Sequence, residues 1–215
     1  AATTARLQAQ RPEATCVGPA VVIGIGDPDG RPFDAERRQR ALLPVPDGAD
    51  RFLDMIVEEV LPTVAQIAPL DPARRALAGH SYGGLFVLHT LFTRPGLFTS
   101  LAAGSPSIWW QDRAILASED MFRRGGSASA GRLLITVGSH EQDPVLAVTP
   151  QRAERLARAR MRDNAAEMAA RLTASGRLDC SFTEFPSENH VSVIPAMLAR
   201  TVAFALAGTA QDKAA

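Results

Sequence analysis

The sequence predicts an α/β fold built on a mainly parallel sheet that helices cover on both faces. Three observations carry this prediction. Short apolar segments alternate along the chain with longer segments whose patterning is typical of helices. The short segments are apolar at successive positions, which indicates strands buried on both faces. Polar clusters follow these segments directly, at the strand ends where parallel sheets place their functional loops.

We expect five strands, each a short run of aliphatic residues bounded by turn residues. They cover residues 20–24, 74–78, 97–103, 132–137 and 178–185. The turn that ends the first run is a cluster of Gly, Asp and Pro at 26–30, which favours reversal of the chain.

Helices are expected where apolar residues recur at helical spacing. These segments are 51–67, 85–92, the long amphipathic stretch 150–175 and the final segment 193–206. Residues 31–50, rich in Arg and Pro, are expected to form a loop. Because no repeat and no linker interrupts the pattern, we predict a single domain spanning 1–215.

The composition argues against several classes of partner. The chain has 215 residues, and its 23 Lys and Arg balance its 23 Asp and Glu, so we expect no nucleic-acid partner. No apolar run approaches the ~20 residues that a membrane span needs. Cys16 and Cys180 lack metal-ligand spacing, and we expect two separate thiols rather than a disulfide. The compartment, cytoplasmic or periplasmic, stays undecided.

The segment Gly79-His80-Ser81-Tyr82-Gly83 has the G-x-S-x-G pattern of a nucleophile elbow. It stands between an expected strand and an apolar helix, which is the context that this motif requires. The turn is sharp, so its flanking positions must be small, and glycines occupy both. Ser81 is therefore the predicted nucleophile, and the backbone N–H of Tyr82 is the predicted oxyanion donor.

A serine nucleophile needs a base, and the chain has four histidines. His190 follows the last expected strand, which fits the order serine, acid, histidine along the chain. His80 is expected to support the turn and His89 to pack inside a helix. His140 is the one serious rival as base.

The acid that orients the histidine is expected in the loop after residue 137. Glu141 is favoured over Asp143, and Glu188 is a further alternative. A dyad of serine and histidine without a carboxylate stays open. The loop SPSIWW after the neighbouring strand contains Trp109 and Trp110, which either pack beneath the loop or line a pocket that suits an aromatic or catechol group.

Four segments together resemble one family. GHSYGG, SPSIWW, GSHE and FPSENHVSVIP are similar, in this order, to motifs of the esterase D-like branch of the α/β hydrolases. Within it the chain is most similar to siderophore esterases that cleave enterobactin- and salmochelin-type trilactones. The resemblance implies an α/β-hydrolase fold, a serine esterase that forms an acyl-enzyme, a small-molecule ester substrate such as a catecholate siderophore, and no metal or organic cofactor.

The chain departs from this family at its N-terminal end. Members have further strands and a loop of the LDGN type before the helix with which this chain begins. In the family that loop supplies a second oxyanion donor. Because the sequence contains neither the loop nor these strands, the sheet is expected to lack its first strands and the site its second donor. Two other functions fit the same fold: an acyltransferase, and a binding protein without turnover. A competing alcohol separates the first from an esterase, and an unreactive Ser81 identifies the second.

Overall fold

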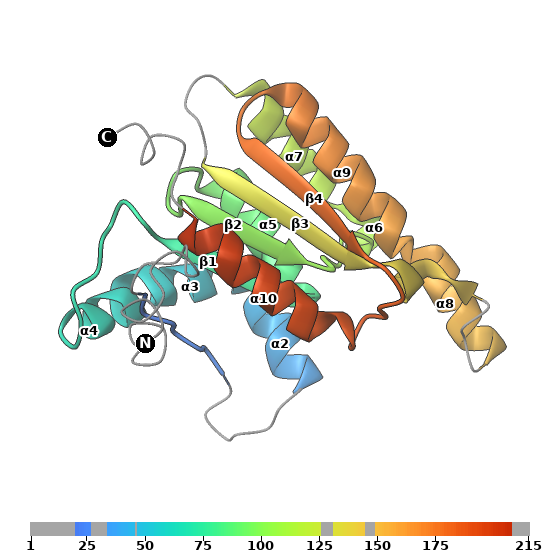
Figure 1. Cartoon of the computed structure of the whole chain (residues 1–215), viewed down its shortest axis with the longest axis horizontal. Helices are drawn as coiled ribbons and strands as arrows, with labels where there is room; N and C mark the ends of the chain where they lie inside the picture. Colours follow the sequence, from blue (N-terminus) through green and yellow to red (C-terminus); the bar gives the residue numbers. More distant parts are fainter. Residues whose placement is uncertain (1–19, 27–33, 46, 126–130, 145–148, 208–215) are drawn as a thin grey trace, which may run out of the picture.

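A computed structural model describes residues 20–26, 34–45, 47–125, 131–144 and 149–207. Its described strands form one parallel sheet in chain order, β1-β2-β3-β4 (Figure 1). The strands are β1 (Ala76–His80), β2 (Ser100–Gly104), β3 (Arg132–Gly138) and β4 (Asp179–Phe185). All three neighbouring pairs are parallel, as the sequence predicts, so the carboxyl ends of the strands lie at one edge of the sheet.

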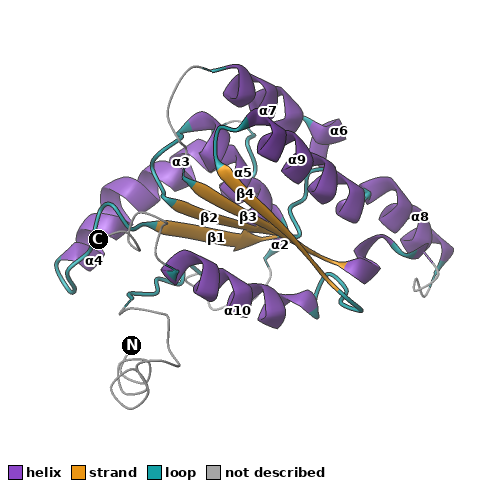
Figure 2. Ribbon diagram, turned by 45° about the horizontal axis from the view of Figure 1, so that its top comes forward, coloured by secondary structure: helices purple, strands orange, loops and turns teal. Residues whose placement is uncertain are grey.

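Helices cover both faces of this sheet (Figure 2). One face carries α5, α7 and α9, and α10 lies across the other. Helices α5, α7 and α9 lie in the connections between successive strands, as a parallel sheet requires, and α10 follows the last strand. The longer described helices are α2 (Ala35–Leu42), α3 (Gly48–Met55), α5 (Tyr82–Thr93), α7 (Ile115–Arg124), α8 (Pro150–Ala159), α9 (Met161–Ser175) and α10 (Val193–Leu206).

The core lies between the sheet and the α5 face. Leu85 and Leu88 of α5 and Leu133 and Ile135 of β3 are at most 1% exposed. Leu172 of α9 completes this layer. Burying each such side chain contributes about 1.5–3 kcal/mol, so the core fixes the strand ends that carry the polar loops.

The prediction of a strand at 20–24 is wrong. Residues 20–26 are described as chain outside any helix or strand, and Val22 is 88% exposed. A run of β-branched residues favours a strand, but a strand also needs a neighbour to accept its backbone hydrogen bonds. In the described part of the chain β1 is an edge strand.

The loop expected at 31–50 contains two helices, α2 and the start of α3. The side chain of Asp34 accepts a hydrogen bond from the N–H of Arg37 at 3.0 Å and so caps α2. The segment 51–67 is helical as predicted, although it passes through a π-helical turn, η2 (Ile56–Val60), before α4 (Leu61–Ala65).

The single helix expected at 150–175 is two helices. Arg160 separates α8 from α9 with φ 43° and ψ 45°, a left-handed conformation that ends one helix and starts the next. The short helix α6 (Trp110–Arg113) and the longer α7 were not predicted from the sequence. The last helix, α10, has the predicted bounds.

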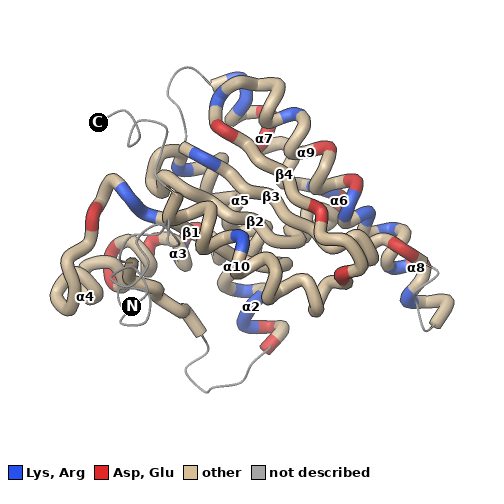
Figure 3. The backbone as a smooth tube through the Cα atoms, in the orientation of Figure 1, with Lys and Arg blue, Asp and Glu red and all other residues tan. Residues whose placement is uncertain are grey.

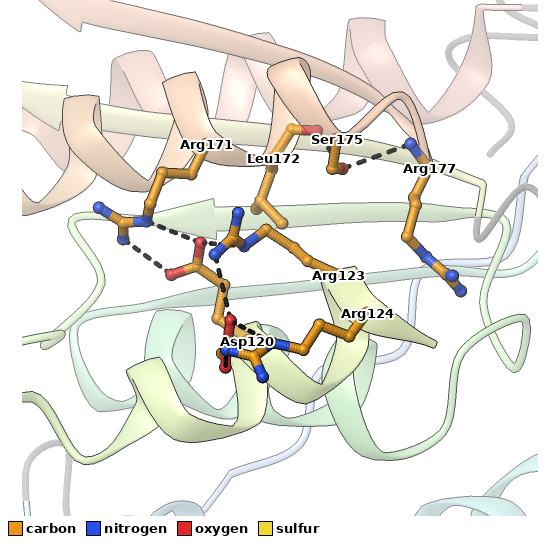
Figure 4. A network of polar contacts seen from close by, with 8 residues as sticks. Asp120, Arg123, Arg124, Arg171, Leu172, Ser175 and Arg177 are labelled. Carbon is orange, nitrogen blue, oxygen red and sulfur yellow. Dashed lines mark hydrogen bonds and ion pairs between the residues drawn. The ribbon is translucent and has the colours of Figure 1, made fainter. Parts of the chain in front are cut away.

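Charged side chains join α7 to α9 on the outer layer. Glu119 of α7 is 1% exposed, and its two carboxylate oxygens each accept a hydrogen bond from Arg171 of α9 at 2.7 Å. Arg123 and Arg124 extend the network through Asp120 (Figure 4). Burying a carboxylate costs free energy unless it is paired, and the bidentate contact with Arg171 compensates for this cost.

The structure also bears on the predictions about the cysteines and about membrane spans. Cys180 is a free thiol, and burial raises its pKa to about 11, while Cys16 lies outside the described residues. None of the helices in the described ranges is both long and apolar enough to cross a bilayer.

Candidate active site

Ser81 lies in the turn where β1 becomes α5. Its backbone has φ 63° and ψ −116°, a conformation that costs a non-glycine residue about 1–3 kcal/mol. A Cβ atom added at Gly79 would lie 2.3 Å from the carbonyl oxygen of Gly83, so only glycine fits there. At Gly83 an added Cβ would meet nothing within 4 Å. The steric demand of the motif thus falls on Gly79.

The structure brings Ser81, His190 and Glu141 together from three strand ends. The Oγ atom of Ser81 lies 3.0 Å from Nε2 of His190. On the other side of the ring, Nδ1 of His190 lies 2.6 Å from Oε2 of Glu141. In the tautomer that donates Nδ1–H to this carboxylate, Nε2 can accept the proton of the serine hydroxyl.

Glu141 is held in one orientation by the loop around it. It belongs to the 3₁₀ turn η3 (Ser139–Gln142) and is 1% exposed. The N–H of Gly138 donates to its Oε1 at 2.7 Å, and the hydroxyl of Ser105 donates to the same oxygen at 2.5 Å. Of the three candidate acids, Glu141 is the one whose carboxylate the structure places on the imidazole of His190.

Two serines of the SPSIWW loop belong to this centre, and sequence reasoning missed both. Ser105 is fully buried with φ 42° and bonds Glu141. Ser107 is 2% exposed, and its Oγ lies 3.4 Å from the Oγ of Ser81. Their position after β2 was the available signal, because this loop lies next to the elbow at the same sheet edge.

The backbone N–H of Tyr82 lies at the first position of α5. The first N–H groups of a helix have no partner within it, and the helix dipole adds positive potential there. A donor in this position can stabilise a negative charge on an oxygen atom beside Ser81.

The other histidines take different positions. The ring of His80 contacts the ring of His190, with 4.5 Å between their centroids. Burial, followed by the charge of His190, lowers the pKa of His80 to about 4, so His80 is neutral at physiological pH. His89 is buried in α5 and bonds Asp50 at 2.9 Å. His140 bonds Glu188 through its backbone N–H.

A cleft of about 900 Å³ opens over Ser81 and His190. Trp109 lines it, is 38% exposed and lies 6.4 Å from the ring of Tyr82, centroid to centroid. Trp110 packs against the hydrophobic core and does not line this cleft. Of the two tryptophans expected to line a pocket or to pack, Trp109 therefore lines the cleft and Trp110 packs against the core.

The sequence matches a family of known proteins. The family described as "Putative esterase" matches residues 2–187. The chain is 33% identical to the ferri-bacillibactin esterase BesA of Bacillus subtilis, over 94% of this chain and 72% of the relative. It is 38% identical to the siderophore enterobactin esterase of Emericella nidulans, over 94% of this chain and 76% of the relative.

Solved structures agree with the sequence comparisons. The siderophore hydrolase EstA from Aspergillus nidulans superposes with a TM-score of 0.80 at 36% identity, covering 94% of this chain and 76% of that one. The BES protein from Bacillus cereus superposes with a TM-score of 0.77 at 29% identity, covering 95% and 78%. The chain therefore belongs to the Esterase family and is a hydrolase of carboxylic esters with the α/β-hydrolase fold.

Proposed function

We propose that the chain hydrolyses the ester bonds of a siderophore through an acyl-enzyme formed on Ser81. The contact series from Ser81 through His190 to the buried Glu141 carries this proposal. The relatives add the substrate class, since their names refer to bacillibactin, triacetylfusarinine C and enterobactin. The cleft supplies an aromatic surface at Tyr82 and Trp109 that suits a catechol ring.

In the first half of the reaction, Oγ of Ser81 attacks the ester carbonyl carbon while Nε2 of His190 takes the hydroxyl proton. The N–H of Tyr82 stabilises the negative oxygen of the tetrahedral intermediate. Glu141 stabilises the imidazolium. The carbon–oxygen bond to the leaving alcohol then breaks, and His190 gives its proton to that oxygen, so that an ester of Ser81 remains.

In the second half, His190 takes a proton from water, and the hydroxide oxygen attacks the acyl carbon. The bond to Oγ of Ser81 breaks, and His190 returns the proton to the serine. The products are a carboxylic acid and the free enzyme, so one water is consumed for each ester bond. His190 serves as base and then as acid in each half.

The test is hydrolysis of the enterobactin trilactone, followed by chromatography and mass spectrometry of the ring-opened acids. Each cleavage adds the mass of one water, and we expect this product with the wild-type chain and none with Ser81→Ala. A competing alcohol such as methanol separates hydrolysis from acyl transfer. Predominance of the methyl ester over the acid at low methanol would favour an acyltransferase and contradict the proposal.

A further inference from the structure

Helix α8 presents a row of arginines to the catalytic cleft. Arg152, Arg155 and Arg158 follow one another at intervals of three residues, so they lie on one side of the helix. All three line the cleft that contains Ser81 and His190. Figure 3 shows the basic residues along α8, beside the carboxyl edge of the sheet.

Two of these arginines have no counter-ion within the described part of the chain. Arg158 is paired with Glu154 at 2.5 Å, whereas Arg152 and Arg155 form no ion pair with any described residue. An exposed guanidinium without a carboxylate partner is available to an anionic ligand, because binding the ligand breaks no ion pair among the described residues.

The carboxylates of the cleft do not neutralise this charge. Glu141 is buried and bonded to His190 and Ser105, and Glu154 is bonded to Arg158. Asp112 of α6 is the remaining acidic residue of the lining. Two unpaired positive charges on one helix therefore face one negative charge that comes from a different element.

The fold does not depend on these side chains. Arg152 and Arg155 are exposed, and α8 contains no buried residue. The helix lies at the margin of the molecule, where it contacts the η3 turn that carries Glu141 (Figure 1). A basic surface that contributes so little to the core and faces the nucleophile is suited to recognising the substrate.

Charge distinguishes two forms of a catecholate siderophore. Three catecholates carry two negative charges each when they bind iron(III). The three positive charges of the iron offset half of these six, so the complex has a net charge of minus three. The iron-free compound keeps its phenolic protons at neutral pH, as expected for groups with a pKa near that of tyrosine, and is neutral. Guanidinium groups favour the charged form over the neutral one.

We infer that Arg152 and Arg155 make the enzyme prefer the iron-loaded, negatively charged form of a catecholate siderophore to its iron-free form. This inference rests on the proposed function and names the substrate state within it. The guanidinium groups attract the anionic complex into the cleft and hold it over Ser81.

The test compares kcat/KM for iron-loaded and iron-free enterobactin, in the wild-type chain and in the double variant Arg152→Gln/Arg155→Gln. The ratio of the two values, iron-loaded over iron-free, is expected to fall about tenfold in the variant because two charge contacts are lost. Raising the salt concentration should lower the ratio in the wild type and have a weaker effect in the variant.

A matched control removes two charges elsewhere. Arg74 and Arg200 are exposed and lie outside the cleft, so Arg74→Gln/Arg200→Gln changes the net charge equally and should leave the ratio unchanged. Hydrolysis of a neutral p-nitrophenyl ester, measured on every variant, shows that the catalytic centre is assembled.

The outcomes separate the two proposals. Cleavage of enterobactin with the same ratio in the wild type and the α8 variant would overturn the arginine inference alone. A fall of equal size in the control pair would also overturn it, because net charge would then be the cause. Cleavage of the p-nitrophenyl ester without cleavage of either form of enterobactin would overturn both this inference and the proposed catecholate substrate.

Discussion

The carboxylate of Glu141 lies 2.6 Å from Nδ1 of His190, although the two residues are 49 positions apart and Glu141 is buried. The strand β4 and the helices before it separate them along the chain. The parallel sheet brings the ends of β3 and β4 to one edge and thereby places the acid against the base.

Replacing Glu141 by Gln tests this contact. An amide side chain does not hold the histidine in the required tautomer or stabilise the imidazolium, so kcat on a p-nitrophenyl ester should fall by about 10²–10⁴-fold. Asp143→Asn, two residues away, removes the same charge and should change kcat by less than about threefold. If the two variants lost activity equally, Glu141 would not be the acid.

Ser105→Ala tests the support of Glu141. The substitution leaves Oε1 with the N–H of Gly138 as its remaining bond. Loss of a buried hydrogen bond to a charged group should lower the free energy of unfolding by about 1–3 kcal/mol. We also expect lower kcat with little change in KM, because the acid is less firmly oriented. Urea unfolding and steady-state kinetics on the same preparation measure both effects, and an unchanged kcat would contradict the assigned role.

The two elbow glycines should differ in their tolerance of alanine. Gly79→Ala places a methyl group 2.3 Å from a backbone carbonyl oxygen, which forces the elbow apart. We expect loss of more than about 3 kcal/mol of stability or failure to fold. Gly83→Ala meets open space and gains helix propensity, so its melting temperature should equal or exceed that of the wild type. Equal losses in both variants would refute this steric account.

The low pKa of His80 predicts a pH dependence of stability. Its pKa of about 4 in the folded state lies below the ordinary 6.5, so the unfolded chain binds more protons between these values. Stability is therefore lost as the pH falls through 6.5 toward 4. The loss from this group between pH 7 and pH 5 should be about 2 kcal/mol. Urea unfolding of wild type and His80→Phe at both pH values measures it, and an equal loss in the variant would contradict the assignment.

The sequence predicted the parts of the site that follow from pattern and position. Ser81 lies in a motif with its own strand and helix context, and His190 and Glu141 follow strands that share an edge. The choice among Glu141, Asp143 and Glu188 needed coordinates, because all three are acids in nearby loops. Only the folded loop shows which carboxylate is buried against the imidazole.

Other features depended on tertiary contacts that no local pattern reports. In the sequence, Ser105 looks like an ordinary loop residue, because its contact with Glu141 arises only from the pairing of β2 with β3. The break at Arg160 was missed because a left-handed conformation at arginine has no sequence signature comparable to that of glycine. The failed strand prediction at 20–24 has a similar cause, since β-branched residues indicate the tendency to form a strand but not its neighbour.

Intact-mass spectrometry after treatment with a fluorophosphonate probe tests the central claim most directly. Phosphonylation requires a serine made nucleophilic by a neighbouring base. We predict a single adduct on the wild-type chain and none on Ser81→Ala, with both proteins shown to be folded by circular dichroism. A folded wild-type protein that stays unlabelled, or an adduct that persists in Ser81→Ala, would contradict the assignment of Ser81 as the activated nucleophile.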